Sequence, residues 1–250
     1  MVERQYMIMP LAKISLYKSL FRGREDVYAL RWEKKGRSGY MPAYKVDWTD
    51  YHQHKSKGGS FSNYEKKEYL PLNDEAIRDH LSGKSTVGVY PLLQDNTSFF
   101  IAADFDENDW QKSILKLYHV CQEIGFPAAI ERSRSGNGGH LWLFFEENTP
   151  AFISRNILLE LLIQAGVISK FEKEPSFDRL FPNQDTHSGK GIGNLIALPL
   201  QGIALSNGNS CFVNPQTWEP FTDQWSFLQS IKRIPKQKIE AVYLQLSSKS

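Results

Sequence analysis

The stretch SFFIAADFD, residues 98–106, is an apolar run of strand length that ends in two acids separated by one residue. Because side chains alternate between the faces of a strand, Asp104 and Asp106 should project to one side and Phe105 to the other. Two neighbouring carboxylates at the end of a buried strand repel each other and lose hydration, so a bound cation would stabilise them. Oxygen ligands of this kind suit Mg²⁺ or Mn²⁺. The alternative is a helix N-cap beside a solvated acid, and the spacing alone favours neither.

The composition indicates an ordered globular protein. The 250 residues are 41% hydrophobic and 13% aromatic, enough to bury a sizeable core. The two cysteines, Cys121 and Cys211, form no C-x-x-C pair. We therefore expect a reducing compartment, the cytoplasm, and no cysteine-based zinc site. No apolar run reaches membrane-spanning length and no signal-peptide pattern is present, so we expect no membrane partner.

The net charge of +2 does not by itself indicate nucleic-acid binding. Segments 22–37 and 52–67, however, interleave Lys and Arg with aromatic residues. Such mixtures suit a phosphate backbone with stacked bases, and they equally suit a solvated loop. The candidate nucleic-acid contacts in these segments are Arg22, Arg24, Lys55 and Lys57.

Hydrophobic periodicity and capping residues predict a chain of mixed helices and strands. The predicted helices cover residues 10–21, 73–81, 110–124, 149–165, 223–231 and 236–246. The predicted strands cover residues 27–32, 86–90, 98–106, 128–132, 140–145, 194–200 and 210–213. Residues 33–70 are polar without clear periodicity, and we interpret them as a long excursion that orders when a partner binds. The element order indicates a mixed α/β or α+β fold.

A glycine-rich turn, RSRSGNGGH over residues 132–140, separates two of the predicted strands. Its glycines, including Gly138, permit positive φ and leave backbone N–H groups uncovered for phosphate oxygens. Further donors come from Arg132, Arg134, Ser135 and Asn137, and His140 begins the following strand. A plain hairpin with a solvent-facing histidine is the alternative, although such a hairpin seldom needs so many glycines, arginines and a histidine together.

A third candidate acid, Asp178, stands in an apolar context between Phe177 and Leu180, where a charge without a function would be unfavourable. The nearby Ser188–Gly191 loop contains Lys190, which would bring a positive charge toward a triphosphate.

The order of three motifs resembles the archaeo-eukaryotic primase superfamily. The motifs are ADFD (103–106), SGNGGHLW (135–142) and FD (177–178). The subgroup that the chain resembles most is the primase-polymerase domain of TOTE conflict systems and of CRISPR-associated primase-polymerases. Further segments extend the resemblance from about residue 13 to residue 240. They are FRGREDV (21–27), GVYPLL (88–93), DRLFPNQ (178–184) and GNLIALPL (193–200).

The resemblance implies an α+β primase core of two α/β modules, one of them RRM-like, with the active site in the cleft between their sheets. We expect one catalytic domain over residues 1–250, with an N-terminal module to about residue 95 and a catalytic module over 96–250. Asp104, Asp106 and Asp178 resemble the acids that hold two Mg²⁺ or Mn²⁺ ions. The turn and His140 resemble the motif that contacts the phosphates of an incoming NTP or dNTP.

The implied activity is that of a DNA-dependent primase-polymerase, which extends and initiates strands on a single-stranded DNA or RNA template. Implied partners are a primer and a helicase, nuclease or CRISPR-system protein. Two departures from the family pattern stand out. Residues 51–60 lack the cysteine cluster of several relatives, and Gly138 replaces the serine that many relatives place two residues before the histidine. A D-x-D nucleotide-sugar transferase and a non-catalytic nucleic-acid-binding module remain the alternatives.

Overall fold

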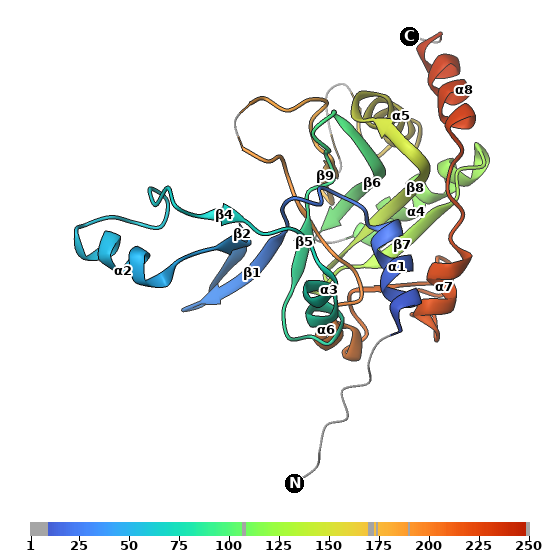
Figure 1. The fold of residues 1–250 in the computed structure, drawn as a ribbon. Helices are drawn as coiled ribbons and strands as arrows, with labels where there is room; N and C mark the ends of the chain where they lie inside the picture. Colours follow the sequence, from blue (N-terminus) through green and yellow to red (C-terminus); the bar gives the residue numbers. More distant parts are fainter. Residues whose placement is uncertain (1–9, 107–108, 170–172, 174, 190, 249–250) are drawn as a thin grey trace.

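The computed structural model describes residues 10–106, 109–169, 173, 175–189 and 191–248. Two β-sheets with helices around them form the body, and an arm extends from one side (Figure 1). The fold is α+β, as predicted. The helices are α1 (Leu11–Leu20), α2 (Trp48–Ser56), α3 (Asp74–Leu81), α4 (Trp110–Glu123), α5 (Ala151–Gln164), α6 (Gly202–Ser206), α7 (Gln224–Ser230) and α8 (Lys236–Ser247). None of the described helices is long and apolar enough to cross a membrane.

The strands form three antiparallel sheets. They are β1 (Ala29–Lys34), β2 (Arg37–Pro42), β3 (Tyr44–Lys45), β4 (Glu68–Tyr69), β5 (Val87–Val89), β6 (Thr97–Asp106), β7 (Ala128–Arg132), β8 (Gly138–Pro150), β9 (Phe177–Phe181), β10 (Ile196–Ala197) and β11 (Cys211–Phe212). The five-stranded sheet has the order β11-β7-β8-β6-β9, and the four-stranded sheet has the order β10-β5-β1-β2. Because β10 completes the second sheet, the two sheets do not divide the sequence cleanly at residue 95.

The apolar stretch SFFIAADFD (98–106) lies in β6, between β8 and β9. One face of its sheet buries Ile101, Ala103 and Phe105 against α4, α5 and α8. The other face buries Phe100 and Ala102 in a second core with α1, α3, α7 and the four-stranded sheet. Alternation along β6 therefore directs Asp104 and Asp106 to the face that the N-terminal elements cover.

The region 33–70 is not the irregular excursion that we expected. It contains β2, the β3–β4 pair and α2, which together form the arm (Figure 1). Asp47 caps α2 by accepting hydrogen bonds from the backbone N–H groups of Thr49 and Asp50. The arm is held by ring contacts rather than by an aliphatic stripe, and these join Tyr44, Tyr51, Phe61, Tyr64 and Tyr69. Irregularly spaced aromatic residues produce no periodic signal, which explains the wrong prediction.

Other element boundaries differ modestly from expectation. The helix predicted from residue 149 begins at Ala151, with Pro150 as its N-cap, because β8 continues through Thr149 to pair with the start of β6. The strand predicted over 194–200 shortens to β10. The helices predicted near residues 10, 73, 110, 223 and 236 are confirmed within one or two residues.

Candidate metal and nucleotide site

Three acids from two neighbouring strands converge at one end of the five-stranded sheet. Asp104, Asp106 and Asp178 each offer a carboxylate oxygen, and these oxygens all lie within 4.8 Å of one another. The convergence arises because β9 runs antiparallel beside β6, with Leu180 opposite Ala103 and Phe177 opposite Phe105. Asp104 and Asp106 lie inside a strand rather than at a helix start, so the N-cap alternative is wrong.

Burial and like charge disfavour ionisation of Asp104. Its side chain is only 13% exposed. Burial raises the pKa of Asp104 to about 6, an effect that His140 opposes and that Asp106 and Asp178 reinforce. Arg179 partly balances the negative charge of the three acids, since its Nε lies 2.6 Å from Asp178 Oδ2. A carboxylate cluster with this excess of negative charge is suited to a divalent cation.

His140 lies directly opposite Asp104 on β8 and connects the acids to a second buried carboxylate. Its Nε2 is 3.4 Å from Asp104 Oδ1, and its Nδ1 is 2.9 Å from Glu131 Oε2. Glu131 also accepts a hydrogen bond of 2.9 Å from the indole N–H of Trp142. Burial alone would lower the pKa of His140, but Glu131 and Asp104 raise it to about 9. The imidazole therefore holds a positive charge next to the acids at neutral pH.

Gly138 lies opposite Asp106 at the start of β8. A Cβ atom at this position would overlap the Asp106 carboxylate and the carbonyl oxygen of Phe105. Glycine therefore leaves the Asp106 carboxylate in place, and a serine here would displace it. The departure from the family pattern that we noted at Gly138 has a direct structural consequence.

The predicted donors of the glycine turn are not all placed together. Arg132 lies opposite Gly139, on the sheet face away from His140, and its guanidinium donates to the carbonyl oxygens of Gly208 and Trp218. Ser135 accepts a hydrogen bond from the backbone N–H of Asn137, and both residues are exposed. Arg132 is therefore engaged elsewhere, and its predicted contact with phosphate is not supported. Lys190 lies outside the described residues.

Three further residues, Arg31, Tyr40 and Arg134, lie together near the turn. Arg31 and Tyr40 were not among the candidates from the sequence, and Arg134 was predicted only as one of the donors of the turn. Arg134 in the turn hydrogen-bonds Tyr40 of β2. The pKa of Arg31 in β1 is lowered mainly by burial and, in addition, by the nearby positive charge of Arg134. Two guanidinium groups held near each other attract an anion. Tyr40 and Arg31 lie directly opposite each other in the β1–β2 pair, a register that the sequence alone does not give.

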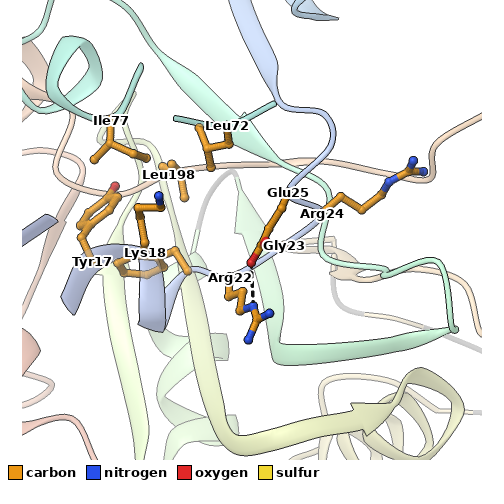
Figure 2. Close-up of a pocket in the computed structure, with 10 residues that line it drawn as sticks. Tyr17, Lys18, Arg22, Gly23, Arg24, Glu25, Leu72, Ile77 and Leu198 are labelled. Carbon is orange, nitrogen blue, oxygen red and sulfur yellow. Dashed lines mark hydrogen bonds and ion pairs between the residues drawn. The ribbon is translucent and has the colours of Figure 1, made fainter. Parts of the chain in front are cut away.

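The four predicted nucleic-acid contacts, Arg22, Arg24, Lys55 and Lys57, do not belong to the cluster of Arg31, Tyr40 and Arg134. Figure 2 shows Arg22 and Arg24 at a pocket. This pocket is lined by the end of α1, by the loop that follows it, and by Leu72, Ile77 and Leu198. Arg22 is ion-paired with Glu25, and Arg24 with Asp26. Lys55 and Lys57 lie exposed on the arm, at the end of α2. These four residues stay predictions.

Comparisons with known proteins identify the family. A family model described as the archaeo-eukaryotic primase domain of TOTE conflict systems matches residues 12–242, close to the range of 13–240 that we expected. A search of curated protein sequences found no significant match.

Two solved structures are similar to the chain, each at 14% sequence identity. The polymerase domain of Mycobacterium tuberculosis Ligase D in complex with DNA has a TM-score of 0.43, covering 95% of this chain and 85% of that one. The AEP domain of the cyanophage S-2L primase-polymerase has a TM-score of 0.35, covering 89% of this chain and 98% of that one. The family match spans nearly the whole sequence. The chain therefore belongs to the archaeo-eukaryotic primase domain family of TOTE conflict systems, whose members are nucleotidyltransferases.

Proposed function

We propose that the protein is a DNA-dependent primase-polymerase that adds nucleotides from NTP or dNTP to a 3′-hydroxyl on a single-stranded template and also initiates primers. The observation that carries this proposal is the convergence of Asp104, Asp106 and Asp178 within 4.8 Å. A D-x-D sugar transferase would not need Asp178 beside the other two acids. A non-catalytic binding module would not need a buried carboxylate whose ionisation is unfavourable.

The three aspartates fit two Mg²⁺ or Mn²⁺ ions, because they offer carboxylate oxygens as ligands. Their negative charge is only partly balanced by His140 and Arg179. Asp104, Asp106 and Asp178 would hold these ions. When bound, the ions lower the pKa of the attacking 3′-hydroxyl and stabilise charge on the phosphoryl and pyrophosphate oxygens.

The remaining residues would bind and orient the triphosphate. The protonated His140 and the guanidinium group of Arg134 offer positive charge around the anion, and Arg31, itself ion-paired with Glu33, lies beside Arg134. Ser135 and Asn137 offer neutral side-chain donors at the turn, whereas Gly138 is buried at the start of β8, where its carbonyl oxygen accepts a hydrogen bond from the Ser133 N–H. In the reaction, the 3′-oxygen forms a bond to the α-phosphorus, the bond to pyrophosphate breaks, and the hydroxyl proton is released. Alignment of the reactants can contribute roughly 7–11 kcal/mol to catalysis.

Primer extension on a single-stranded DNA template tests the proposal. The wild-type protein with Mn²⁺ should incorporate nucleotides, and reactions without a primer should yield short products. Asp178→Asn should reduce incorporation by at least about a hundredfold, while Asp185→Asn, in the loop that follows β9, should retain it. Equal incorporation by wild type and Asp178→Asn would refute the assignment. Separate NTP and dNTP pools in the same experiment determine the sugar preference.

A further inference from the structure

The β1–β2 hairpin carries three basic side chains, Lys34, Lys35 and Arg37, at its outer end. Its strands pair in register from Ala29–Pro42 to Lys34–Arg37. Lys35 and Gly36 close the hairpin with φ values of 50° and 74°. Positive φ at both central residues is typical of the two-residue turn whose twist matches that of paired strands. The turn therefore defines the backbone at this end, from which the basic side chains project.

One face of this outer end combines an aromatic ring with two cations. Trp32 and Lys34 share a face because they are two residues apart, and their partners Gly39 and Arg37 face the same way. A Cβ atom at Gly39 would lie 3.0 Å from Cζ2 of Trp32, so the indole lies close over the backbone of β2. Trp32 is nevertheless 39% exposed. The indole thus presents a free surface, flanked by Lys34 and Arg37.

The charge of the hairpin end is not balanced locally. Its acid, Glu33, is ion-paired with Arg31. Lys34, Lys35 and Arg37 have no ion-pair partner among the described residues. Together with Arg31, Glu33, Gly36 and Ser38 they line a concavity of about 390 Å³ at the tip, to which Trp32 does not contribute. Residues 31–69 contain nine Lys and Arg against five Asp and Glu, a net charge of +4, whereas the whole chain carries +2. The positive charge is therefore concentrated on the hairpin and arm.

The inner end of the same hairpin adjoins the candidate site. Arg31 and Tyr40 lie opposite each other on the hairpin, and both lie near Arg134 in the glycine turn. The hairpin therefore presents Arg31 and Tyr40 to the turn on one face at its inner end, and carries Trp32, Lys34 and Arg37 on the opposite face at its outer end.

We propose that the outer end of the β1–β2 hairpin binds the single-stranded template, with a base stacked on Trp32 and phosphates at Lys34 and Arg37. The inference rests on the proposed function, because it assigns the site a template strand. Stacking on an exposed ring flanked by cations suits single-stranded nucleic acid, since every base offers a π-face and every nucleotide a negative charge. An acidic protein surface would use the lysines but would have no need for the ring.

Fluorescence anisotropy of a labelled 20-nucleotide single-stranded DNA, without metal or nucleotide, tests this inference. Lys34→Gln/Arg37→Gln should weaken binding by about 25-fold at 0.1 M salt, and the slope of log K against log salt should become shallower by about 1.4. Lys232→Gln/Lys236→Gln removes the same charge from exposed residues elsewhere and should bind like wild type. Equal affinity of both double variants and wild type would overturn the proposal.

The aromatic platform is tested separately. Trp32→Ala should weaken binding about tenfold with an unchanged salt slope, and Trp32→Phe should restore most of the affinity. Phe152→Ala, which truncates an exposed ring on α5, should have no effect. If Lys34→Gln/Arg37→Gln reduces binding of duplex DNA equally and Trp32→Ala changes nothing, the hairpin is a general polyanion surface and the stacking assignment is wrong.

Primer extension by the same variants separates this inference from the proposed function. If wild type extends primers and the hairpin variants bind and extend equally well, the template assignment fails and the proposed function stands. If wild type binds DNA through the hairpin but incorporates nothing with any nucleotide pool, the proposed function fails.

Discussion

The Nδ1 atom of His140 lies 2.9 Å from Oε2 of Glu131, a carboxylate whose side chain is only 2% exposed. This contact determines the charge of the imidazole that faces Asp104. The ring nitrogen donates to Glu131, and the opposite nitrogen is directed at the acids. Glu131 therefore acts on the candidate site through His140, without joining the acids itself.

Replacing Glu131 by glutamine should lower the pKa of His140 from about 9, because it removes the main charge that opposes the effect of burial. The Trp142 hydrogen bond can persist to the amide oxygen, so the fold should survive with a loss of roughly 1–3 kcal/mol. An NMR titration of His140 in the metal-free protein measures the change. Glu219→Gln, at an exposed carboxylate, is the control. An unchanged His140 titration in Glu131→Gln would contradict the pairing.

Asp104→Asn should stabilise the metal-free protein at pH 8. The folded pKa of Asp104 is about 6 and the ordinary value is 3.8. Because the folded state keeps the proton over that interval, stability falls as the pH rises from about 4 to 6, by up to about 3 kcal/mol. In Asp104→Asn the side-chain amide does not ionise, so this loss of stability is absent. Urea unfolding at pH 8 measures the gain, and no gain would indicate that Asp104 is not strained by burial.

The same variant should lose its response to metal. Mn²⁺ should raise the melting temperature of wild type, because an ion that binds only the folded state stabilises it, and the shift should shrink below pH 6 as Asp104 takes up its proton. Asp104→Asn should show no shift at any pH. A full shift in the variant would place the metal elsewhere.

Gly138→Ser should reduce Mn²⁺ affinity at least about tenfold, because an added Cβ overlaps the Asp106 carboxylate. Calorimetric titration measures the affinity. Gly166→Ala is the matched control, since its φ is 66° but an added Cβ meets nothing within 4 Å. That variant should lose about 1 kcal/mol of stability and bind Mn²⁺ normally. Equal affinity in both variants would show that position 138 does not control Asp106.

His80 should make the protein acid-sensitive independently of the site. It is fully buried, accepts a hydrogen bond from the Val87 N–H and contacts the Pro199 carbonyl. Burial lowers the pKa of His80 from 6.5 to about 4. Between those values only the unfolded state binds the proton, so stability is lost as the pH falls from 6.5 to 4, by up to about 3 kcal/mol. In His80→Gln this part of the pH dependence should vanish. An unchanged pH profile would refute it.

The sequence predicted much of the site because its parts follow from strand alternation. Asp104 and Asp106 had to share a face once residues 98–106 formed a strand, and both lie as expected. The approach of Asp178 depends on β9 pairing with β6, a long-range contact that local pattern does not specify. Its apolar context nevertheless marked it as a candidate.

Other parts required the register between strands. Arg132 looked like a phosphate ligand, but pairing with Gly139 turns it to the opposite face. The same register brings Glu131 beside His140, and no feature of AAIER (128–132) marks that glutamate in advance. The arm escaped prediction because its core consists of aromatic rings at irregular spacing. Local periodicity thus gives the elements, and pairing between distant strands decides which side chains meet.

Anomalous diffraction from crystals soaked with Mn²⁺ and a non-hydrolysable nucleotide tests the central claim most directly. We expect manganese peaks bound by Asp104, Asp106 and Asp178, with the triphosphate on the side of His140 and the glycine turn. Nucleotide bound elsewhere, or manganese absent from the three acids when nucleotide is present, would contradict it.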